Sequence, residues 1–163
     1  MVAQNVVFGV LALVMVVAGF RLVTTQNVVR AALFLAIVLA GVAGIFVLLL
    51  AEFVAWVQVL VYIGAIVVLL LFGVMLTRAP IGREGGLDND QRGVGVLVAA
   101  SVLAALAAVL VDAFGDDKIA FTRVQRTAEV SDSIFGTYVV PFEVASVLLL
   151  AALVGAVALA RRD

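Results

Sequence analysis

Charged residues divide this chain into five long runs of uncharged, mostly apolar residues. A helix needs about 20 such residues to cross a hydrocarbon core about 30 Å thick. The runs cover residues 1–20, 31–51, 53–77, 93–111 and 144–160. They predict an all-α integral membrane protein with five transmembrane helices. These are expected at about residues 2–23, 28–50, 53–77, 93–114 and 139–160, within a single membrane domain over residues 1–163.

The composition supports a membrane protein and argues against several kinds of site. Hydrophobic residues make up 66% of the 163 residues and charged residues 13%, whereas about a quarter of the residues in a soluble domain are charged. The chain has no Cys and no His, so we expect no disulfide, no thiolate metal site, no haem held by imidazole and no redox centre of its own. The net charge of -1 provides no basic surface for nucleic acid.

The distribution of basic residues predicts the orientation in the membrane. Alternation of the five spans puts seven arginines on one side and Lys118, Arg123 and Arg126 on the other. The seven are Arg21, Arg30, Arg78, Arg83, Arg92, Arg161 and Arg162. Because cytoplasmic loops carry an excess of basic residues, the N-terminus is expected outside and the C-terminus in the cytoplasm. A cleaved signal peptide is the competing interpretation of the first run, and it is disfavoured because the first basic residue follows the apolar stretch.

Two polar segments connect the later spans. Residues 78–92 contain a proline and several glycines, which is typical of a flexible cytoplasmic connection. Residues 115–138 form an expected external loop with charges of both signs. Within this loop Thr122, Val124 and Gln125 suit a strand, and a loop lying on neighbouring proteins fits equally well.

The third run carries polar residues that membrane insertion does not require. Gln58 and Tyr62 are four residues apart, so on an α-helix they share one face. Their polar atoms are expected to meet another helix or a trapped water, because unsatisfied polar groups in hydrocarbon are costly. A purely structural role for Tyr62, as a contact between helices, stays open. Gly64 permits either a close helix approach or a local widening into a π-bulge, and periodicity does not decide between them.

Carboxylates of the third and fifth runs lie near helix ends. Glu52 is either a solvated carboxylate at the membrane surface or a functional group, since insertion leaves its identity unconstrained. Pro141 is a suitable first helical residue. The carboxylate of Glu143 would then lie in the first turn, where the positive end of the helix dipole stabilises it. Ser146, with small residues beyond it, predicts a helix-packing surface. No span carries an ionisable group near its middle, which argues against a free-standing transporter.

Three stretches together resemble subunit J of bacterial respiratory complex I, whose mitochondrial counterpart is NADH dehydrogenase subunit 6. The most specific is AEFV at residues 51–54, followed by QVLVYIGAIVVL at residues 58–69. The second is YVVPFEVASVLLL at residues 138–150. The third, at residues 27–34, is weaker, and Val28 stands where many relatives have Pro. The likeness covers all five expected spans.

The resemblance implies a membrane-arm subunit of a proton-pumping NADH:quinone oxidoreductase in the bacterial inner membrane. Its expected partners are the small three-helix subunit with intramembrane glutamates, the quinone-binding membrane subunit and an antiporter-like subunit. The complex would use NADH, FMN, iron-sulfur clusters and a quinone, none of them bound by this chain. A subunit of a related cation/proton antiporter or membrane-bound hydrogenase is the alternative.

The resemblance also implies a mechanism. In the family the third helix forms and loses a π-bulge, which is linked to water access along a central polar axis. For this chain the resemblance implies that Tyr62 and Gly64 lie at the hinge of the third helix and that Gln58 faces the central polar axis. The hypothesis is that quinone reduction shifts the third helix between two backbone registers and so gates a proton path, with Glu52 as a further candidate residue.

Overall fold

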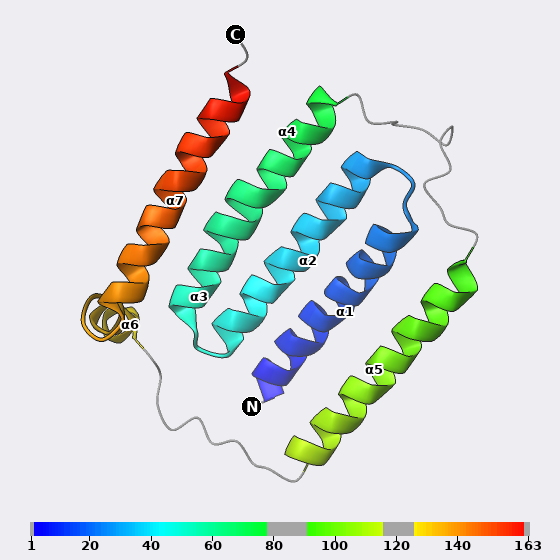
Figure 1. The fold of residues 1–163 in the computed structure, drawn as a ribbon. Helices are drawn as coiled ribbons and strands as arrows, with labels where there is room; N and C mark the ends of the chain where they lie inside the picture. The colour runs from blue at the N-terminus through cyan, green and yellow to red at the C-terminus, as the bar shows by residue number, and fades with distance from the viewer. Residues whose placement is uncertain (1, 78–90, 116–125, 162–163) are drawn as a thin grey trace.

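The computed structural model describes residues 2–77, 91–115 and 126–161, and within them it is all-helical. Four membrane spans are single α-helices: α1 (Val2–Thr24), α2 (Val28–Leu48), α5 (Arg92–Phe114) and α7 (Val139–Ala160). The third span has three parts, α3 (Glu52–Val57), the π-helix η1 (Gln58–Val67) and α4 (Val68–Leu76). The five predicted spans are confirmed, because five helices of the described chain are long and apolar enough to cross a membrane (Figure 1).

The first three spans form a packed row with α2 in the middle. Helix α2 contacts α1 on one side and the third span on the other, while α1 and the third span do not contact each other in the described structure. The buried residues of this row are mostly small, namely Ala18, Ala32, Gly41, Ala43 and Ala55. Small residues allow close approach of helix backbones, which is the usual basis of helix association in membranes.

Gly41 lies where α1 comes closest to α2. A Cβ atom at this position would overlap Met15 Cγ and lie 2.7 Å from Met15 Sδ. We expect Gly41→Ala to destabilise the pair by about 1–3 kcal/mol, the usual cost of overpacking. The measurement is the midpoint of thermal disassembly of the purified complex.

Gly44 provides the matched control for this prediction. Its added Cβ would lie 3.1 Å from Leu11 Cδ1, so the neighbour needs to move only slightly. Gly44→Ala should therefore lower the midpoint less than Gly41→Ala. Equal midpoints for the two variants would show that the α1–α2 contact is not limited by space at Gly41.

The last two spans stand apart from this row. In the described structure α5 contacts no other element, and α7 contacts only the short helix α6 (Thr127–Phe135). Both spans expose their leucine and valine side chains along their whole length. Apolar surface of this extent belongs against lipid or against other proteins, so the chain by itself does not form a closed bundle.

A tight turn at residues 49–51 connects α2 to the third span. The Ala51 N–H donates to the Phe46 carbonyl at 2.9 Å and the Leu50 N–H donates to the Val47 carbonyl at 3.0 Å. This pair of bonds is a Schellman motif, whose αL position is usually glycine. Here Leu50 occupies that position with φ 60, although a side chain in αL costs about 1–2 kcal/mol.

We expect Leu50→Gly to relieve this backbone strain. Leu49 is the control, because it has the same side chain and a φ of -81. Leu49→Gly removes a side chain without relieving strain, whereas Leu50→Gly does both. The Leu50→Gly complex should be more stable than the Leu49→Gly complex by about 1 kcal/mol, measured by thermal disassembly. Equal stability of the two variants would mean that the αL conformation carries no cost in the assembled protein.

The structure adds a helix to the segment that was expected to be an external loop. Helix α6 occupies residues 127–135, and it was not predicted because a nine-residue helix of mixed polarity gives no membrane-length signal. The possible strand at Thr122, Val124 and Gln125 lies outside the described residues.

Helix α7 covers the expected residues 139–160, but Pro141 is its third residue and not its first. The helix begins at Val139, and the Phe142 N–H already donates to the Tyr138 carbonyl at 3.1 Å. Pro141 is tolerated in third position because the first N–H groups of a helix have no partner within it. Glu143 consequently lies beyond the first turn, where the helix dipole favours a carboxylate less.

Candidate functional site in the third span

The third span is wound as a π-helix over the ten residues of η1. Of the two alternatives at Gly64, the structure shows the widened helix. Most π-helical segments are single-turn bulges, and they occur frequently at functional sites. A segment of ten residues is longer than one such turn, so η1 is the most unusual backbone feature of the described chain.

The π winding decides which residues of the third span face α2. Gln58 and Val67 are 7% and 2% exposed. Among the described elements, α2 is the only one outside the third span that η1 contacts. At about 100° per residue an α-helix would place residues nine apart on opposite faces. The wider π winding, with about 4.4 residues per turn, lowers the rotation to roughly 82° and returns both residues to one face. The burial of both therefore depends on the π winding.

Gln58 is the buried polar residue of the described chain. Its side chain forms no hydrogen bond within the described residues. No side-chain nitrogen or oxygen there is fully enclosed without a partner, so the Gln58 amide reaches the edge of the α2–η1 contact. Within the described chain α2 provides the burial of Gln58, and the placement of Gln58 toward a polar axis stays a prediction.

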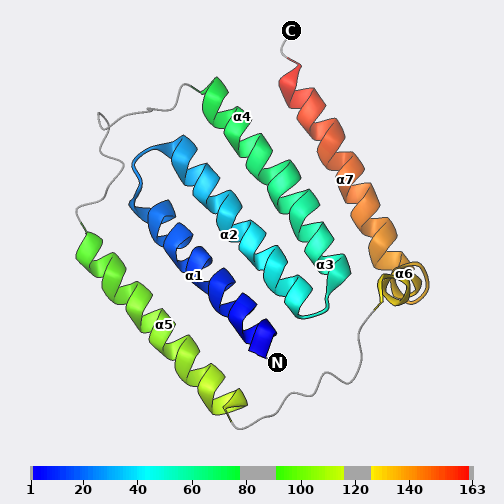
Figure 2. The same ribbon diagram turned by 180° about the vertical axis from the view of Figure 1, so that it is seen from behind.

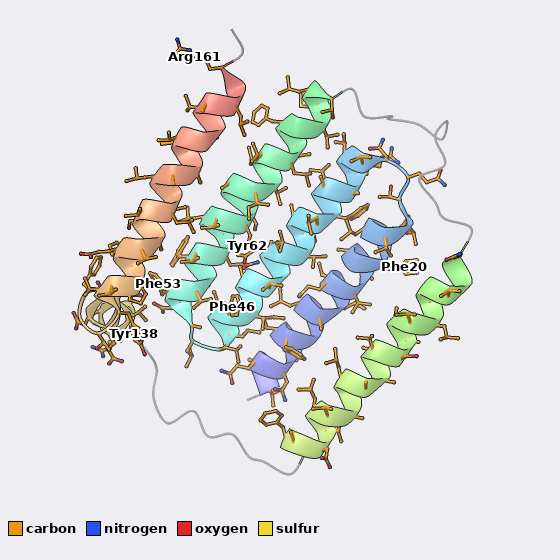
Figure 3. All side chains as sticks on the ribbon, in the orientation of Figure 1. Phe20, Phe46, Phe53, Tyr62, Tyr138 and Arg161 are labelled. Carbon is orange, nitrogen blue, oxygen red and sulfur yellow. The ribbon has the colours of Figure 1, made fainter. Side chains whose placement is uncertain are left out.

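Tyr62 does not share the buried position of Gln58. Its side chain is 44% exposed, and its hydroxyl forms no hydrogen bond within the described structure. In the view of Figure 3 it lies on the side of η1 toward α2. An α-helix would set the two residues about 40° apart in one direction, and the π-helix sets them roughly 33° apart in the other. Both windings therefore keep Gln58 and Tyr62 on the same side of the helix, with Tyr62 the more exposed of the two.

Gly64 is exposed and has open space around it. A Cβ atom there would meet only the Val59 carbonyl oxygen, at an ordinary contact distance of 3.5 Å. No helix in the described part of this chain approaches it closely. Gly64 therefore places no side chain on the surface of η1, the segment that is wound as a π-helix.

Glu52 begins α3 and is exposed. A carboxylate in the first turn is stabilised by the positive end of the helix dipole, which agrees with a carboxylate at the membrane surface. Glu143 is also exposed. Ser146 donates its hydroxyl to the Phe142 carbonyl at 2.9 Å, so its proton is satisfied within α7. In the described structure α7, which carries Glu143 and Ser146, does not contact η1, whereas α3 with Glu52 leads directly into it.

Val67 was not anticipated as a site residue. It is apolar and gives no chemical signal, and only the π winding brings it to the face occupied by Gln58. The described residues contain no group of three or more Asp or Glu side chains that could hold a metal. The site therefore consists of the Gln58 amide and the π-helical backbone of η1, which differs from the α-helical winding of the rest of the span.

The fold and this span define a multi-pass membrane protein with an unpaired polar group and a π-helix in its third span. Residues 18–159 match the model of the family NADH-ubiquinone/plastoquinone oxidoreductase chain 6. The chain belongs to this family, which confirms the resemblance to subunit J. It is therefore a membrane subunit of an oxidoreductase complex, and other subunits of that complex are its partners.

Individual relatives cover nearly the whole chain. F(420)H(2) dehydrogenase subunit J of Methanosarcina mazei is 42% identical over 98% of this chain and 92% of the relative. NAD(P)H-quinone oxidoreductase chain 6 of Leptolyngbya boryana is 37% identical over 98% of this chain and 81% of the relative. The corresponding chain 6 of Synechocystis is 38% identical, with 98% and 82% covered.

Proposed function

We infer that this chain couples quinone reduction to proton translocation through a change in the winding of its third span. The observation that carries the proposal is η1, ten π-helical residues with a buried amide at their start. A return to α-helical winding would turn Val67 away from the face of Gln58. Two windings with different buried faces provide the two states that a gate requires.

The gate acts on a proton path made mostly by other subunits. No ionisable side chain lies near the middle of a span of this chain, and proton relays in membranes generally use such groups. The proposed neighbours are the small three-helix subunit with intramembrane glutamates, the quinone-binding membrane subunit and an antiporter-like subunit. The chain itself is a coupling element without a catalytic residue.

The electron donor is proposed to be NADH, with FMN, iron-sulfur clusters and a quinone held by other subunits. Relatives named for F(420)H(2) and for NAD(P)H share similar sequences with this chain. A coupling element that serves different donors acts after electrons have entered the complex. The winding mechanism therefore does not depend on the identity of the donor.

The proposed location is the bacterial inner membrane, with the N-terminus outside and the C-terminus in the cytoplasm. The ends of α1 and α7 that carry Arg21 and Arg161 lie at the same side of the molecule, opposite the N-terminus (Figure 1). An excess of basic residues marks the cytoplasmic side. Labelling of an added cysteine at residue 2 by a membrane-impermeant reagent in intact cells tests this orientation.

Purification of an affinity-tagged chain tests the assembly. We expect it to co-isolate with flavin and iron-sulfur subunits and with NADH oxidation that rotenone or piericidin inhibits. Co-isolation with a cation/proton antiporter or with a hydrogenase would instead support the alternative assemblies. The chain alone in liposomes should give no proton flux.

Replacement of Glu52 tests whether its charge matters. Glu52→Asp keeps the charge and Glu52→Gln keeps the size. If the carboxylate takes part in coupling, Glu52→Gln should lower NADH:quinone turnover several-fold while Glu52→Asp retains most of it. Full activity in both variants would leave Glu52 as a solvated carboxylate at the start of α3.

A further inference from the structure

Helix α6 runs across the ends of the membrane spans. In Figures 1 and 2, which view the protein from opposite sides, the five spans run in the plane of the picture and α6 is seen end-on. Its axis is therefore close to perpendicular to the spans. A helix perpendicular to transmembrane helices lies along the membrane surface.

A short connection holds α6 at the level where α7 enters the membrane. Only residues 136–138 separate the two helices. The Gly136 N–H donates to the Asp132 carbonyl at 2.9 Å, and the Tyr138 N–H donates to the Ser133 carbonyl at 2.9 Å. Both bonds fold the connection back onto α6. The ring of Phe135 also meets Phe142 of α7 edge-on, with a centroid distance of 5.0 Å.

The side chains of α6 divide into an inner and an outer set. Val130 and Ile134, four residues apart, are half-buried, and the elements that α6 contacts are α3 and α7. Ser131 and Asp132 are exposed. Phe135 and Tyr138 remain 63% and 59% exposed although they are large and aromatic. Aromatic residues with one apolar and one wet side are enriched at the boundary between lipid headgroups and acyl chains.

We propose that α6 is an interfacial anchor whose Phe135 and Tyr138 lie in the headgroup boundary of the bilayer. At 100° per residue Ser133 lies about 160° from Phe135 around the helix, and its exposed side chain faces water. Within α6 the charged residues are Glu129 and Asp132, with no basic residue, so attraction to anionic lipid is not the basis of binding. The partner is the apolar boundary of zwitterionic lipid, which aromatic side chains enter without charge pairing.

The anchor has a structural consequence for the rest of the chain. Among the described elements α6 alone contacts both α3 and α7. It therefore holds the start of α7 next to the first turns of the third span, where Glu52 lies. This inference is independent of the proposed gating, since it concerns only where α6 sits in the membrane.

Spin labels on the complete purified complex in phosphatidylcholine nanodiscs test the proposal. The chain has no cysteine, so Phe135→Cys and Ser133→Cys each add one labelling site. The complex with the unaltered chain measures the background signal from the other subunits. We expect the label at 135 to collide several-fold more often with oxygen than with a water-soluble nickel chelate. The label at 133 should show the reverse preference.

Two other outcomes would overturn the proposal. Equal access of the nickel chelate to both labels would place α6 in water, above the membrane. Protection of the 135 label from both reagents would show that another subunit, not lipid, covers it. If Phe135→Cys prevents assembly, the same measurement on Tyr138→Cys decides, because this side chain is expected in the same boundary.

Discussion

Gly64→Val is expected to leave the complex assembled while lowering quinone reduction and proton pumping together by about tenfold. Gly64 is exposed, and no helix of the described chain approaches it, so a larger side chain does not disturb packing within the chain. Its Cβ atom, however, would already touch the Val59 carbonyl, which is the acceptor position of π-type bonding from residue 64. The two further methyl groups of Val crowd this carbonyl. A shift of about 1.4 kcal/mol in favour of α-helical winding changes the balance of states tenfold.

Gly73→Val in the same span is the control for this prediction. Gly73 lies in the regular helix α4, and an added Cβ would meet nothing within 4 Å. The same exchange of residues should therefore leave turnover close to that of the unaltered complex. Normal turnover in an assembled Gly64→Val complex would contradict the gating proposal. Loss of turnover in both variants would mean that the exchange acts through insertion or packing of the span.

The five spans could be predicted from sequence because the membrane imposes one simple requirement. A helix across the bilayer must be long and apolar whatever its neighbours are, and each of the five runs meets this requirement. Helix α6 has no such signal, because it lies along the spans' ends and its nine residues mix serines, acids and apolar side chains. The αL conformation of Leu50 was also not predictable, since glycine is the residue that marks this position in sequences.

The site was only partly accessible to sequence analysis. The residue types at Gln58, Tyr62 and Gly64 indicated a polar segment and a possible widening of the helix. Their four-residue spacing placed Gln58 and Tyr62 on one face, and in the structure Gln58 is buried against α2 while Tyr62 is half-exposed. The position of Val67 on the face of Gln58, in contrast, follows from the π-type hydrogen-bond pattern of the backbone. A change of roughly 18° per residue is invisible in the sequence and accumulates to about half a turn by Val67.

Gln58→Leu should separate the stability of the third span from its function. Leu has nearly the same size as Gln, so contact with α2 is retained. An amide removed from water without a hydrogen bond costs about 2–7 kcal/mol, and the Gln58 side chain forms none within the described residues. In the working complex the amide therefore requires a ligand at the edge of the α2–η1 contact, and we expect this ligand to be a water of the gated path. Loss of the amide should lower turnover at least about tenfold without lowering the midpoint of thermal disassembly.

Val67→Ala is the matched control, since Val67 is buried on the same face but has no polar atom. Removing two methyl groups there leaves a cavity and should cost about 1–3 kcal/mol of stability, while the complexes that remain assembled keep their turnover. The two variants thus have opposite effects on stability and activity. Full turnover of a stable Gln58→Leu complex would show that the amide only fills space, and the proposal of a water site would then fail. A large loss of stability in Gln58→Leu would show instead that the amide pairs with a partner subunit.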